Sequence, residues 1–217
     1  MAGMPPVHLI LGDDEFLTER ARLHIQRAAA EESGSSGTRP ELTKLKASEV
    51  SEGELLEATS PSLFGDNRVI VISDCERAGK EVVDILLRAC ANPAPGMTMV
   101  IIYSVTAKTL KKKKKKQPEL VAKLRKIAEV HEVFSLYPNE LGQWATREFS
   151  SHGVRPTPDV IHAVLEGVGS DLRELASAIS QLVSDTGGNV TREAVQNYYV
   201  GVCLLYTSDA ADEEDSV

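Results

Sequence analysis

The sequence predicts an α/β fold, a parallel sheet with helices on both faces, followed by a small all-helical domain. Short apolar runs recur at Val7–Leu11, Val69–Ser73 and Met97–Tyr103, and helical patterns separate them. Strands that are buried on both faces are continuously apolar, and strands that alternate with helices form parallel sheets. After Pro138 only helical patterns remain, which predicts a domain boundary near residue 137.

The first half of the α/β domain is expected to alternate strand and helix. A strand over Val7–Leu11 ends at Gly12 and leads into an amphipathic helix, whose acidic first turn suits the helix dipole. Residues 41–47 alternate like a short strand. Ser48 is then placed to cap a helix that continues to Ala58.

The second half continues the alternation. The strand over Val69–Ser73 precedes a helical pattern over Lys80–Cys90, whose apolar residues share one face. The strand over Met97–Tyr103 leads into a lysine-rich helical segment, and Glu129–Leu136 is a fourth strand candidate.

Helix-start signals divide residues 138–200. Thr157 followed by Pro158 marks a helix start, because proline is tolerated in the first turn. Asp171 and Glu174 form a capping pair for the next helix, and Thr191 is placed to cap a last short one. These signals predict a small helical bundle.

Composition limits the classes of function. The chain has 217 residues and a net charge of −8, of which the last fifteen residues supply five, so the rest carries only −3. Such a balance does not indicate a general basic face for DNA.

The cysteines and the apolar segments indicate the compartment. The three cysteines, Cys75, Cys90 and Cys203, share no metal-like spacing, which fits a reducing compartment. No stretch suits a membrane span, so we expect a cytoplasmic protein without a membrane partner.

The first strand–helix junction lies where α/β folds bind phosphate. A working phosphate loop has the pattern GxxxxGK[ST], in which backbone amides and a lysine bind the phosphates. Here the second glycine and the lysine are missing, and three carboxylates would repel a triphosphate. We therefore expect no nucleotide hydrolysis, no catalytic residue and no cofactor. The degenerate loop comprises Gly12, Asp13, Asp14 and Glu15.

The acids of this junction permit a second interpretation. Receiver-like signalling domains hold magnesium with an acidic pair after the first strand, beside a phosphoacceptor aspartate. Asp13, Asp14 and Asp74 are candidates for such a pocket. The simpler interpretation is that Asp13–Glu15 cap the helix that follows.

The loop SPSLFGD, residues 60–66, places Leu63 beside Phe64. Adjacent side chains in a tight loop cannot easily both turn inward. Either the pair is a surface anchor for a pocket on a partner protein, or Phe64 packs under the sheet as a core residue. The candidate binding residues are Pro61, Ser62, Leu63, Phe64 and Gly65.

Six consecutive lysines occupy residues 111–116. They form either a solvated segment or a local phosphate contact, with Lys111, Lys112 and Lys113 as the candidate DNA-contacting residues. No aromatic residue interrupts the run, so base stacking is not indicated. The five histidines show no ligand spacing, and no metal site is expected.

Three segments together resemble the delta subunit family of bacterial DNA polymerase III, the clamp-loader subunits that open the sliding clamp. They are LILGDDEFL (Leu9–Leu17), SPSLFGDNRVIVISDCE (Ser60–Glu76) and VGSDLRELASAISQL (Val168–Leu182), in the family's order. The resemblance implies an AAA+-like domain with a decayed phosphate loop over 1–137 and a helical lid domain over 138–200. It also implies a collar domain, which is missing here.

The family's clamp contact is a hydrophobic pair in the loop before the second core strand, which matches Leu63 and Phe64. The resemblance implies that this pair enters a pocket of the sliding clamp, the beta subunit. ATP hydrolysis would belong to partner subunits, and the other clamp-loader subunits, gamma/tau and delta prime, would be partners of the chain. The chain would have no active site of its own, yet it would serve a DNA polymerase holoenzyme and reach DNA through that complex. Asp74 and Glu76 match metal-binding acids of active relatives and would be relics.

Residues 201–217 depart from the resemblance. The segment CLLYTSDAADE, Cys203–Glu213, resembles the translated read-through of an adapter used in sequencing libraries. The alternative is a genuine acidic tail, which would be solvated. We expect a non-native tail.

Overall fold

The computed structural model forms two compact units, Met1–Ser135 and Leu136–Val217. The first unit contains a sheet with helices, and the second contains helices. The residues that the structure describes are 4–33, 40–61, 67–112 and 118–198. Within these ranges, no helix combines the length and the apolar character needed to cross a membrane.

The first unit is built on a five-stranded sheet in the order β2-β3-β4-β1-β5, and every neighbouring pair is parallel. β1 lies between β4 and β5, and all six of its residues are buried. The continuous apolar runs therefore mark the strands correctly, as expected for a sheet buried on both faces. The strands are β1 (Val7–Gly12), β2 (Glu41–Lys46), β3 (Arg68–Ser73), β4 (Met97–Ser104) and β5 (Glu129–Val133).

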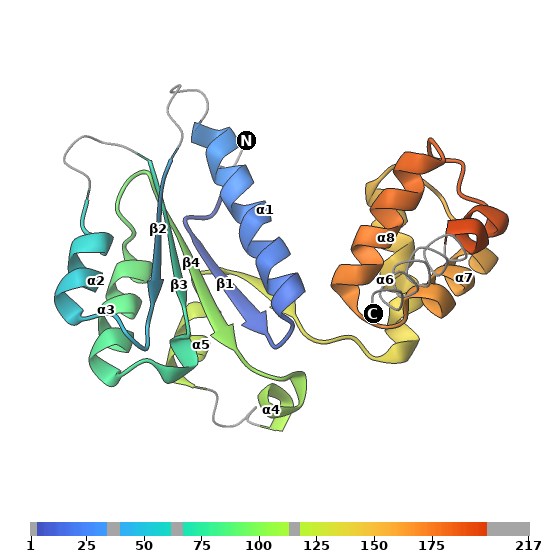
Figure 1. Ribbon diagram of the computed structural model, residues 1–217. Helices are drawn as coiled ribbons and strands as arrows, with labels where there is room; N and C mark the ends of the chain where they lie inside the picture. The colour runs from blue at the N-terminus through green and yellow to red at the C-terminus, as the bar shows by residue number, and fades with distance from the viewer. Residues whose placement is uncertain (1–3, 34–39, 62–66, 113–117, 199–217) are drawn as a thin grey trace, which may run out of the picture. The chain divides into compact units, whose positions relative to one another are not determined.

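Helices cover both faces of this sheet, which confirms the predicted fold class (Figure 1). α1 (Glu15–Ser33) packs Ile25 and Ala29 against one face. The helices α2 (Glu52–Thr59), α3 (Lys80–Ala91) and α5 (Glu119–Leu124) pack against the other. Two short elements follow strands, η2 (Cys75–Arg77) after β3 and α4 (Ala107–Lys112) after β4.

α2 begins later than the sequence predicted. Ser48 lies in a turn, because the amides of Glu49 and Val50 donate back to the carbonyl of Lys46. The N-cap is Ser51, whose hydroxyl accepts from the Glu54 amide while the Glu54 carboxylate accepts from the Ser51 amide. This reciprocal capping box fixes the helix start three residues further on.

β5 ends at Val133, earlier than the expected strand end at Leu136. The amide of Ser135 donates to the carboxylate of Asp13 at 2.9 Å and does not continue the ladder. A side chain of the β1–α1 junction therefore terminates the last strand.

The second unit contains α6 (Pro138–Ser151), α7 (Pro158–Val168) and α8 (Leu172–Asp185), and residues 192–198 are also helical. Asp171 caps α8 by accepting from the amides of Arg173 and Glu174, and Thr191 accepts from the amide of Ala194. The core residues with at most 1% exposure are Ala145, Phe149, Val160, Val164, Leu175, Ile179, Leu182 and Val195.

Candidate functional site

Gly12 ends β1 at the carboxyl edge of the sheet, where it pairs with Val133 of β5. A Cβ atom at this position would lie 1.9 Å from the carbonyl oxygen of Val133, far inside contact distance. The carbonyl of Gly12 also accepts a hydrogen bond from the amide of Val105. The close approach of two strands therefore requires glycine here, independently of any phosphate.

Two of the three acids after Gly12 accept hydrogen bonds from backbone amides. Asp14 is the N-cap of α1, and its Oδ1 accepts from the Leu17 amide at 2.8 Å. Asp13 accepts from the amide of Ser135, and Glu15 is the first residue of the helix. Asp14 thus fits the helix-capping interpretation, and the junction offers no lysine to a phosphate.

Replacing Asp14 with alanine is expected to destabilise the chain by about 1 kcal/mol, because an N-cap acceptor is lost. Asp14→Asn keeps an acceptor and is expected to cost only a small part of that amount. Urea denaturation followed by circular dichroism measures both. An equal loss in the two variants would show that charge, and not capping, is what Asp14 contributes.

The strand order contradicts the receiver-like interpretation. Receiver folds place β1 beside β3 in the order 2-1-3-4-5, which brings their acids together. Here β4 lies between β1 and β3, so Asp74 is separated from Asp13 and Asp14 by a strand. Among the described residues, these three acids do not form a group with metal-ligand distances.

The two acids after β3 also have local structural contacts. Asp74 has a left-handed backbone, with φ of 56°, and its carboxylate lies 3.5 Å from the hydroxyl of Ser48. Glu76 accepts from the amide of Ser104 at 3.1 Å. Both acids therefore connect the end of β3 to neighbouring segments.

The predicted partner-binding loop follows α2 and precedes β3, and the start of β3 lies at the opposite, amino edge of the sheet. Its described flanks are the end of α2 and the start of β3, where the Arg68 amide donates to the carbonyl of Gly96 at 2.9 Å. Pro61 is exposed, and Leu56 on α2 leaves 53% of its surface exposed. The remaining candidates, Ser62, Leu63, Phe64 and Gly65, lie outside the described residues.

The lysine run begins at the end of α4. Lys111 is exposed and Lys112 is the last residue of the helix, whereas Lys113 lies outside the described residues. The Thr106 hydroxyl caps α4 by accepting from the Thr109 amide. A DNA contact by these lysines stays a prediction.

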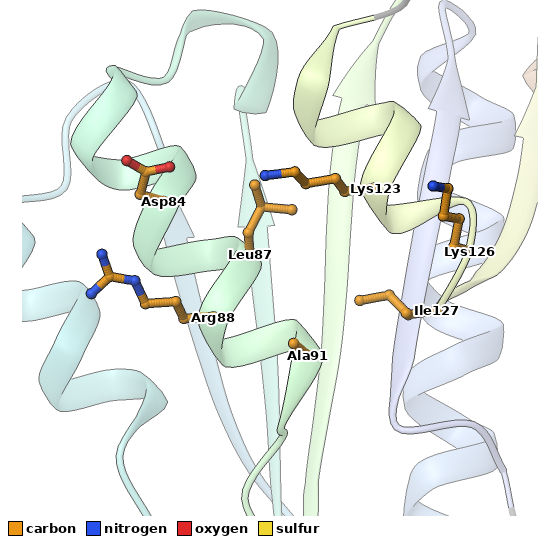
Figure 2. A pocket seen from close by; sticks show the side chains of 7 residues that line it. All are labelled: Asp84, Leu87, Arg88, Ala91, Lys123, Lys126 and Ile127. Carbon is orange, nitrogen blue, oxygen red and sulfur yellow. The ribbon is translucent and has the colours of Figure 1, made fainter.

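Between α3 and α5 lies a hollow of about 410 Å³ that the sequence did not indicate (Figure 2). Its apolar part is formed by Leu87, Ala91 and Ile127, and its charged part by Arg88, Lys123, Lys126 and Asp84. Lys123 pairs with Glu119 at 2.6 Å, and Asp84 adds a negative charge to the lining. This mixture of apolar, basic and acidic side chains therefore indicates no particular class of ligand.

A second arrangement missed by the sequence analysis joins His8 of β1 to Glu129 and His131 of β5. His8 Nδ1 lies 3.2 Å from His131 Nε2 and 3.5 Å from a Glu129 carboxylate oxygen. Burial and then the charge of His131 lower the pKa of His8, against the opposing effect of Glu129. Burial likewise lowers the pKa of His131. Only the strand register reveals the cluster, since His8 lies more than 120 positions before Glu129 and His131 in the sequence.

The strand order and the helices on both faces of the sheet together define an AAA+-like fold, which a helical unit follows in the sequence. Neither a protein-family model nor a curated protein sequence matches the chain.

Among solved structures, the chain is similar to the Bacillus subtilis DNA clamp loader delta protein (YqeN), with a TM-score of 0.69 and 16% identity. The match covers 88% of this chain and 57% of that one, so the chain spans less than two thirds of its neighbour. The Thermotoga maritima RuvB Holliday junction branch migration motor matches with a TM-score of 0.47 and 14% identity, over 90% of this chain and 61% of that one. The likeness to the delta protein shows a shared fold.

Proposed function

We propose that this chain acts as a clamp-loader delta subunit, which binds and opens a bacterial sliding clamp without hydrolysing ATP itself. The observation that carries the proposal is the fold shared with a clamp loader delta protein at a TM-score of 0.69. The junction at Gly12 supports it, because the carboxylates of Asp13 and Asp14 accept from backbone amides. In addition, Thr18 occupies the position of the phosphate-loop lysine, six residues after Gly12. The chain would therefore contribute binding, and its partners would contribute hydrolysis.

The proposed clamp contact is the loop between α2 and β3, with Leu63 and Phe64 as the anchor and Pro61, Ser62 and Gly65 around it. Two described features support a partner at this edge of the sheet. Leu56 and Pro61 are exposed beside the loop, which extends the apolar surface available to a partner. Apolar anchors of this kind supply most of the energy of a protein interface when they fill a pocket.

Opening follows from preferential binding. A ligand shifts a conformational equilibrium only by its difference in affinity for the two states. If the loop binds the open clamp more tightly than the closed clamp, its binding energy favours opening. ATP hydrolysis by partner subunits of the loader, which also contains gamma/tau and delta prime, would then control when the loop is presented. The chain would reach DNA through that complex.

Residues 138–200 would serve as the lid domain. In this proposal the α/β unit holds the clamp. Lys111, Lys112 and Lys113 are the candidates for a direct DNA contact.

Release of a clamp from DNA tests this function. A bacterial sliding clamp is loaded onto nicked circular DNA, and the purified chain is added without ATP. Accelerated release is expected, because binding to the open form shifts the clamp toward opening. Two results would contradict the proposal. Either the clamp is released only when ATP is present, or it stays on the DNA even at a saturating concentration of the chain.

A further inference from the structure

The cluster of His8, Glu129 and His131 lies on the sheet face that α1 covers. His8 pairs with Glu129 across β1 and β5, and His131 follows two residues later, opposite Ile10. Alternate residues of a strand point to the same face. Ile10 belongs to the core under α1, so all three side chains of the cluster are on that face.

The ligand atoms of the cluster converge. His8 Nδ1 is 3.2 Å from His131 Nε2 and 3.5 Å from Glu129 Oε2, and one ligand atom from each of the three residues lies within 4.8 Å of the other two. In a tetrahedral site with metal–ligand bonds of about 2.0–2.1 Å, neighbouring ligand atoms are about 3.3 Å apart. The two measured edges fit that spacing.

Burial differs within the cluster in a way that suits a bound ion. His8 is 2% exposed, while the Glu129 side chain is 48% exposed at the edge strand. The buried imidazole gives a fixed ligand, and the exposed carboxylate leaves a path by which an ion and a water enter. β5 is an edge strand of the described sheet with β1 as its one neighbour, so a bridge between them would secure the edge.

We propose that His8, Glu129 and His131 bind a divalent transition-metal ion, Zn²⁺ in the first instance, which ties the edge strand β5 to the sheet. Two imidazoles and one carboxylate form a donor set used by zinc, with a fourth position left for water. Magnesium and calcium prefer oxygen ligands, so this set selects against them.

A hydrogen-bonded cluster without metal is the alternative. One proton on His8 Nδ1 serves either His131 or Glu129, and it cannot serve both fully. In such a cluster His131 Nε2 and the Glu129 carboxylate share one donor, whereas a cation accepts a lone pair from each of the three ligand atoms. The alternative therefore predicts no zinc dependence, which separates the two cases.

The test uses the full 217-residue chain after treatment with a chelator. Calorimetric titration with ZnCl₂ is expected to give one ion per chain with a micromolar or tighter dissociation constant. The midpoint of thermal unfolding is expected to rise by roughly 5 °C at hundredfold excess over that constant. Titration with Co²⁺ is expected to give the visible absorption of a tetrahedral site.

Two ligand variants and two controls decide the assignment. Glu129→Gln and His131→Gln are each expected to weaken zinc binding by about tenfold or more, while the metal-free variants remain folded. His162→Ala removes an exposed histidine paired with Glu166 at 3.1 Å, and Cys203→Ser removes a thiol outside the described residues. Neither control is expected to change the affinity. Absence of zinc binding, unchanged affinity in both ligand variants, or loss of binding in either control would overturn the site.

Discussion

Replacing Leu63 and Phe64 together with alanine is expected to abolish binding of the chain to a bacterial sliding clamp while the chain stays folded. Truncation of a central apolar anchor costs about 2 kcal/mol or more, so loss of both residues is expected to weaken binding by roughly a thousandfold. The binding is measured by surface plasmon resonance, and folding by circular dichroism. Ile127→Ala truncates an apolar side chain that is 47% exposed elsewhere on the α/β unit, and it is expected to leave clamp binding unchanged.

The two interpretations of this loop predict different outcomes. If Phe64 packs under the sheet as a core residue, the double variant unfolds, because loss of a buried phenylalanine costs about 3–5 kcal/mol. If the pair is the clamp anchor, the variant melts like the original chain and no longer binds. A folded variant with unchanged clamp affinity would place the contact elsewhere.

Gly12→Ala is expected to destabilise the α/β unit by about 3 kcal/mol, the upper end of the range of about 1–3 kcal/mol that overpacking typically costs. The added Cβ would lie 1.9 Å from the Val133 carbonyl oxygen, which is backbone and cannot rotate away. The strands β1 and β5 must therefore separate to relieve the overlap. The free energy of unfolding from urea denaturation measures the effect.

Gly53→Ala is the matched control for this substitution. Gly53 lies in α2, and a Cβ atom added there would meet no other atom within 4 Å. Alanine favours a helix over glycine by about 1 kcal/mol, so this control is expected to be neutral or slightly stabilising. If Gly12→Ala left the free energy of unfolding unchanged, strand packing would not require the glycine. Gly12 would then be only a remnant of a phosphate loop.

The sequence was most informative where local chemistry decides structure. β1, β3 and β4 are continuous apolar runs, and burial of the sheet on both faces produces that pattern directly. The missing lysine after Gly12 is an equally clear signal, because phosphate binding depends on a local loop. The strands could therefore be predicted from short windows of sequence, whereas the absence of nucleotide hydrolysis stays a prediction.

Features that depend on contacts between distant segments could not be predicted in this way. The end of β5 depends on Asp13, more than 120 residues earlier. The strand order that separates Asp74 from Asp13 is likewise a property of the whole sheet. The start of α2 is a different case, since two serines compete for the cap and only Ser51 has a glutamate three residues later.

The histidine cluster shows the same limit for function. Glu129 and His131 lie two residues apart on one strand, and this spacing alone is a weak signal for a metal site. Their third partner, His8, is brought beside them only by the parallel register of β1 with β5. A search for ligand spacing along the chain therefore misses a site that the sheet assembles.

Direct binding of the chain to a purified bacterial sliding clamp, without nucleotide, tests the central claim. A micromolar or tighter dissociation constant that does not change when magnesium and ATP are added is the predicted result. A well-folded chain that does not bind the clamp at all would contradict the account, and would leave an AAA+-like fold with a different partner.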